Sequence, residues 1–140
     1  AEPGAPVCVI DLDTVMQGTV LADFGELVRT SVCSAPEDET RLERIRVDPD
    51  VYRGVSEGFL AGAGSLLTRE ELAALPLAGP SLAIENAVRF LTDHLQGDAY
   101  FRIHHPGHNL ERARAQRRVA EALFEARDLA RSLIEAAAGT

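Results

Sequence analysis

Residues 7–13 read Val-Cys-Val-Ile-Asp-Leu-Asp, a short apolar run rich in β-branched side chains that ends in two carboxylates. The run follows a turn containing Pro3 and Gly4, so residues 7–10 are predicted to form a buried strand. No convincing second strand follows it, and an unpaired strand indicates that a partner is missing. The sequence therefore predicts one short β-strand followed by helices.

Helices are expected over residues 21–32 and 52–60, where apolar side chains recur at intervals of three or four residues. Residues 35–50 mix charges with proline and are expected to form an exposed loop between them. Thr68 followed by Glu71 matches a capping box, which should open a short helix that ends before Pro76.

Two further helices are expected in the second half of the chain. Ser81 should cap the first, which carries Ile84, Val88, Leu91 and Leu95 on one face and ends at Gly97-Asp98. Asn109 should cap a long final helix with an apolar stripe that includes Val119, Leu123, Ala126, Ala130 and Leu133. The fold class is therefore mainly α, in a single domain over residues 1–140.

The 140 residues include 22 acidic and 14 basic residues, giving a net charge of −8, and every basic residue is arginine. This balance disfavours nucleic acid and anionic membranes as partners, and the absence of lysine excludes Schiff-base chemistry and a lysine-containing phosphate loop. Cys8 and Cys33 are expected to be free thiols. No signal peptide or membrane span is evident, so a cytoplasmic location is expected.

Asp11 and Asp13 follow the predicted strand and could hold Mg²⁺, which prefers a few carboxylate oxygens completed by water and phosphate. A capping role for one of them and solvation of the other is the plain alternative. The string Asp11, Asp13, Val15 also fits a haloacid-dehalogenase-type phosphatase, and a bare Asp-x-Asp fits a glycosyltransferase. Both of those folds need further parallel strands, and the phosphatase normally needs a basic residue, usually lysine, beside the phosphate.

Two blocks of sequence carry a more specific resemblance. The first is Val9-Ile10-Asp11-Leu12-Asp13-Thr14-Val15-Met16-x-Gly18, followed by Asp23-Phe24-Gly25 and Arg29. The second is Arg89-Phe90-Leu91-Thr92-Asp93, Gly97-Asp98-x-Tyr100-Phe101 and His104-x-Pro106-Gly107-His108-Asn109-Leu110. In order and separation both blocks resemble N-acetylhexosamine 1-kinase-like members of the aminoglycoside phosphotransferase and choline kinase-like family, which has a protein-kinase-like fold.

The resemblance implies that the chain is the C-terminal portion of a sugar kinase that uses Mg²⁺ and ATP. Asp11 would be a metal ligand, Asp13 a weaker candidate, and Asp23 a buried brace of the catalytic loop. A plain helix-start role competes for Asp23. The catalytic base and the second metal ligand are expected upstream of Ala1, so no catalytic residue is assigned within the chain.

Arg89 and Tyr100 are the substrate-side candidates that the resemblance implies, and Asp93 could join them or orient Arg89. Glu85, Arg89 and Asp93 recur every four residues, so a solvated ladder of ion pairs is the competing interpretation. His104, His105 and His108 suggest a zinc site, but their spacing fits a loop entering the last helix better. A non-catalytic helical module, either a remnant or a subunit completed by a partner chain, remains the alternative function.

Overall fold

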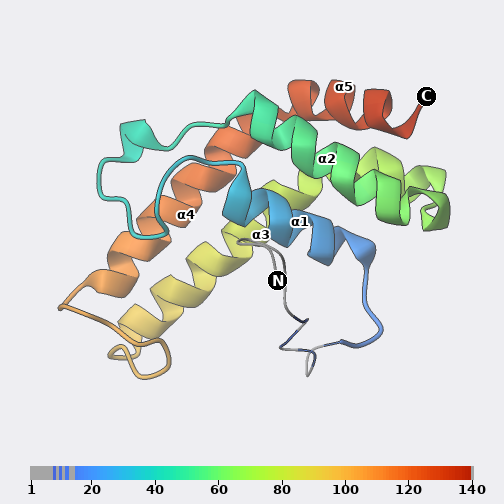
Figure 1. Cartoon of the computed structure of the whole chain (residues 1–140). Coiled ribbons are helices and arrows are strands. Elements are labelled where there is room, and N and C mark those ends of the chain that lie inside the picture. Colours follow the sequence, from blue (N-terminus) through green and yellow to red (C-terminus); the bar gives the residue numbers. More distant parts are fainter. Residues whose placement is uncertain (1–7, 9, 11, 13–14, 140) are drawn as a thin grey trace.

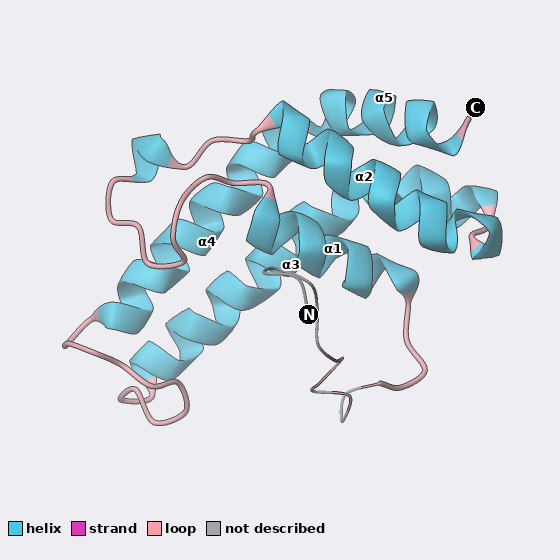
Figure 2. Ribbon diagram, in the orientation of Figure 1, coloured by secondary structure: helices cyan, strands magenta, loops and turns pink. Residues whose placement is uncertain are grey.

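Five α-helices make up most of the chain in the computed structural model, which describes residues 8, 10, 12 and 15–139 (Figures 1 and 2). They are α1 (Val20–Ser31), α2 (Pro49–Ala63), α3 (Arg69–Leu95), α4 (His108–Glu125) and α5 (Arg127–Ala138). Two short 3-10 helices, Leu42–Arg44 and Gly64–Leu66, lie beside α2 in the chain. The mainly helical class predicted from the sequence is confirmed.

The predicted N-terminal strand is not found in the residues that the structure describes. Cys8 and Ile10 are exposed and belong to no strand, whereas Val7 and Val9 lie outside the described residues. Over the described ranges, β pairing is limited to one antiparallel bridge between Cys33 and Val47. An apolar run of four residues gains little from extended backbone without a neighbouring strand to accept its hydrogen bonds.

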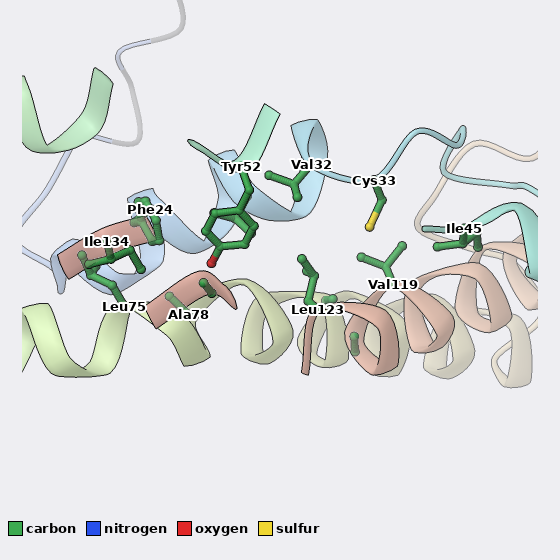
Figure 3. Packing of buried hydrophobic residues seen from close by; sticks show 14 of the residues in the cluster. Phe24, Val32, Cys33, Ile45, Tyr52, Leu75, Ala78, Val119, Leu123 and Ile134 are labelled. Carbon is green, nitrogen blue, oxygen red and sulfur yellow. The ribbon is translucent and has the colours of Figure 1, made fainter. Parts of the chain in front are cut away.

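The long helices α3 and α4 lie side by side and are joined by residues 96–107 at one end (Figure 1). Helix α1 packs against α3, and α2 packs against α5. Each α-helix contributes to one core, and its largest members include Phe24, Tyr52, Leu75, Leu123 and Ile134 (Figure 3). The segment predicted as an exposed loop also contributes, because Ile45 is fully buried.

Helix α3 differs from the prediction of two separate helices. Its start is the predicted capping box, in which Thr68 Oγ1 accepts from the Glu71 amide at 3.2 Å and the Glu71 carboxylate accepts from the Thr68 amide at 2.8 Å. The helix then continues through Pro76 and Pro80, both of which are buried. Each proline removes one backbone hydrogen bond, so packing of this stretch must offset the loss.

The face of α3 that the sequence marks as apolar is exposed. Ile84, Val88, Leu91 and Leu95 are open to solvent, and the buried face carries smaller side chains such as Ala83 and Ala87. We call these four exposed residues the α3 stripe. Short side chains on the inner face allow α3 and its neighbours to approach closely, so the larger apolar residues are left outside.

The final helical region also differs from the prediction. Gly107, in the left-handed conformation with φ 84°, precedes α4, so Asn109 lies inside the first turn rather than at the cap. The expected single helix is interrupted at Ala126, which separates α4 from α5. The predicted stripe is nevertheless largely correct, because Val119, Leu123 and Ala130 are buried.

Candidate functional site

The predicted metal ligands Asp11 and Asp13 lie outside the described residues. Asp23 is described, and it is exposed in the first turn of α1. This is the position that the helix dipole favours for a carboxylate. Bracing of a catalytic loop by Asp23 stays a prediction, although a buried Asp was expected for that role.

The three substrate-side candidates Arg89, Asp93 and Tyr100 line one hollow of about 330 Å³ at the end of α3. The last turns of α3 supply Arg89 and Asp93, and the following loop supplies Tyr100 and Phe101. Val88, Thr92 and Gln96 complete the lining. The structure therefore brings together residues that the sequence separates by as much as eleven positions, because the loop folds back on the helix.

Arg89 is exposed and its guanidinium lies 5.4 Å from the centre of the Phe101 ring, within cation–π range. No ion pair or hydrogen bond joins Arg89 to another side chain in the part of the chain that the structure describes. The ladder of ion pairs through Glu85, Arg89 and Asp93, the competing interpretation, is thus not formed among the described residues. Most of the N–H donors of Arg89 remain available to a ligand in the hollow.

Asp93 has a different character, because it is only 4% exposed. Its Oδ1 accepts from the Tyr100 amide at 2.8 Å, and its Oδ2 accepts from the Phe101 amide at 2.9 Å. Burial by itself raises the pKa of this carboxyl, but the backbone N–H groups of Phe101, Tyr100 and Ala99 hold it below its ordinary value. Asp93 is therefore an ionised acceptor whose oxygens are already engaged.

Asn109 is a member of this site that the sequence prediction missed. Its Nδ2 donates to Asp93 Oδ2 and to Asp98 Oδ1, both at 2.9 Å. Asp98 has a positive φ of 57°, and its amide donates to the Asp93 carbonyl at 2.8 Å. The sequence signals were the place of Asn109 in the second block and the Gly97-Asp98 pair, which marks a turn but does not reveal its partner on α4.

The histidines lie at the start of α4, next to this site in sequence. The ring of His108 is buried; its Nδ1 accepts from the His104 amide at 3.3 Å and its Nε2 donates to Asp38 at 3.1 Å. The hydrogen bond from His108 holds the pKa of Asp38 below its ordinary value. No cluster of three or more His, Cys, Asp or Glu side chains able to hold a metal occurs among the described residues.

No protein-family model matches the chain. None of the helices in the described ranges is both long enough and apolar enough to cross a membrane.

Proposed function

We propose that this chain is the C-terminal portion of an ATP-dependent phosphotransferase of the aminoglycoside phosphotransferase-like type, which phosphorylates a sugar. An N-acetylhexosamine-like acceptor and its anomeric hydroxyl fit the sequence resemblance. In this proposal Asp11 holds Mg²⁺, with Asp13 as a weaker candidate ligand, and the ion neutralises charge on the ATP phosphates. The proposal includes a cytoplasmic location, where ATP is supplied.

The observation that carries the proposal is the hollow shared by Arg89 and Tyr100. A guanidinium that forms no ion pair or hydrogen bond among the described residues and an exposed phenol offer hydrogen bonds to hydroxyl groups, and the aromatic rings of Tyr100 and Phe101 offer an apolar surface. Sugars present this combination of hydroxyl groups and apolar ring faces. Both residues belong to the second sequence block that resembles the kinases.

The test is sugar-dependent release of ADP from Mg·ATP by the protein in which this chain is joined to the expected catalytic loop. Asp11→Ala should abolish the reaction, and Arg89→Ala should raise the KM for the sugar about tenfold, as expected for loss of one charged hydrogen bond. Arg53→Ala is the control, since Arg53 is an exposed arginine on α2 paired with Asp50. Full activity of Asp11→Ala, or no turnover with any hexosamine, would contradict the proposal.

A non-catalytic helical module completed by a partner chain is the second candidate, and the α3 stripe favours it. Several large exposed apolar residues on one helix face are unusual for an isolated domain. Titration of the chain with Mg·ATP and size-exclusion chromatography separate the two functions. A module of this kind should bind no nucleotide even after its partner is supplied, whereas a kinase portion should bind Mg·ATP once it is joined to the expected catalytic loop.

A further inference from the structure

The turn that carries Tyr100 and Phe101 is held by hydrogen bonds to buried side chains rather than by packing alone. We propose that Asp93 and Asn109 are positioning residues of the acceptor hollow: they fix this turn, and through Phe101 they fix Arg89, without touching the ligand themselves. This inference rests on the proposed function of the hollow.

Asp93 sets the direction of the turn because its carboxylate accepts hydrogen bonds from two consecutive backbone N–H groups. Tyr100 N–H points at one carboxylate oxygen and Phe101 N–H at the other, at 2.8 and 2.9 Å. Two bonds to one rigid carboxylate fix orientation as well as distance. With Asn109 also donating to Oδ2, three donors occupy Asp93, so it is poorly placed to bind a substrate hydroxyl.

Asn109 ties this turn to α4. Its Nδ2 divides its two N–H donors between Asp93 and Asp98, and its Oδ1 accepts from Arg112 at 3.3 Å. Asn109 is fully buried. An amide is the side chain that can donate to two carboxylates while accepting from a guanidinium, so neither Asp nor Leu could replace it.

Phe101 transmits the order of the turn to Arg89. Its ring lies 4.7 Å from the ring of Phe90, 4.8 Å from that of Tyr100 and 5.4 Å from the Arg89 guanidinium. Arg89 makes no ion pair or hydrogen bond in the described structure, and Glu26 interacts with it only electrostatically, so the Phe101 ring is the contact that fixes its placement. A shift of the turn would move both the phenol and the guanidinium that face the hollow.

The experiment measures binding of N-acetylglucosamine to the 140-residue chain by NMR titration. Asp93→Asn places an NH₂ group opposite the N–H donors that now bind the carboxylate, and it should weaken sugar binding about tenfold. Arg89→Gln should weaken binding by a similar factor. If Asp93 acts through Arg89, the double variant should bind no more weakly than either single variant, because the effects are then not additive. Asn109→Ala is the second variant in case Asp93→Asn fails to fold.

Asp48→Ala is the matched control for general loss of stability. Asp48 also accepts two backbone N–H bonds, from Asp50 and Val51, but it does so at the start of α2, away from the hollow. This variant should bind the sugar like the wild type. Wild-type affinity in both Asp93→Asn and Asn109→Ala, or additive losses in the double variant, would overturn the inference.

A second readout separates this inference from the proposed function. The Phe101 ring should shift the side-chain proton resonances of Arg89, and the Tyr100 amide should exchange slowly with solvent. If the wild type binds no sugar, the proposed function of the hollow fails. The positioning role is then tested by the Arg89 proton shifts and the Tyr100 amide exchange alone. Their loss in Asp93→Asn but not in Asp48→Ala supports it; their persistence in Asp93→Asn overturns it.

Discussion

Gly25 of α1 lies against the backbone of Ala78 in α3, so closely that a Cβ atom on Gly25 would come within 2.8 Å of the Ala78 carbonyl oxygen. Beside it, a Cβ on Gly79 would come within 2.5 Å of Val28 Cγ1. The two helices therefore touch through their backbones at this point. The stretch of α3 that contains Pro76 and Pro80 is held in the same contact region.

We expect Gly25→Ala to destabilise the protein by about 1–3 kcal/mol, because the added methyl group meets backbone atoms that cannot rotate away. Urea unfolding followed by circular dichroism measures the change. Gly54→Ala on α2 is the matched control, since a Cβ there meets nothing within 4 Å. It should raise stability by up to about 1 kcal/mol through helix propensity, and a Gly25→Ala protein as stable as this control would contradict the close contact.

Removal of the Tyr52 hydroxyl should leave stability unchanged or raise it by up to about 1 kcal/mol, because the buried oxygen has no hydrogen-bond partner among the described residues. Thermal unfolding of Tyr52→Phe tests this. A loss of stability would show that the hydroxyl has a partner, such as a buried water molecule.

The same variant should change the response to alkali. Burial raises the pKa of Tyr52 to about 12 in the folded protein, above its ordinary value near 10. The folded state therefore holds this proton more tightly, and stability is lost as the pH rises from about 10 to 12. Tyr52→Phe should lose less stability over this range, and the chain has no lysine to titrate there. Equal losses in both proteins would contradict the assignment.

The two thiols should react at very different rates. Cys8 is exposed, whereas burial raises the pKa of Cys33 to about 11 and leaves little thiolate at neutral pH. A chromogenic disulfide reagent should label one thiol rapidly and the second only as the protein unfolds. Cys8→Ser should abolish the rapid phase, and two rapid phases in the wild type would show that Cys33 is accessible.

The turn after α3 should loosen in acid. The lowered pKa of Asp93 means that its contribution to stability is present above its ordinary pKa of about 4 and is lost as the pH falls through the lower folded value. NMR should show the Tyr100 and Phe101 amides shifting together over that range. Their resonances in Asp93→Asn should lack this step, and an identical step in the variant would assign it to another carboxyl group.

Local patterns predicted much of the secondary structure. The capping box at Thr68 and the apolar spacing over residues 21–32 are signals contained within one or two turns, and the structure confirms both. Pro76 led to a wrong helix end. The backbone hydrogen bond that the proline removes is outweighed by its burial between helices, and the sequence does not show that burial. Periodicity groups the α3 stripe on one helix face, but it cannot tell which of two helix faces finds a neighbour.

The candidate site was predicted in part. Sequence resemblance selected Arg89, Asp93 and Tyr100, and the structure places all three at one hollow. The sequence could not predict that the Asp93 carboxylate accepts hydrogen bonds from backbone amides and from Asn109. Both facts depend on how the loop folds back on α3. The roles of Asp11 and Asp13 stay predictions.

The α3 stripe has a practical consequence for work on the isolated chain. Attraction between exposed apolar faces weakens on cooling, because its driving force near room temperature is the entropy of water. Samples kept cold and dilute should therefore stay dispersed, while warm, concentrated or sulfate-rich ones should self-associate. Purification and crystallisation conditions will decide which of these two behaviours is observed.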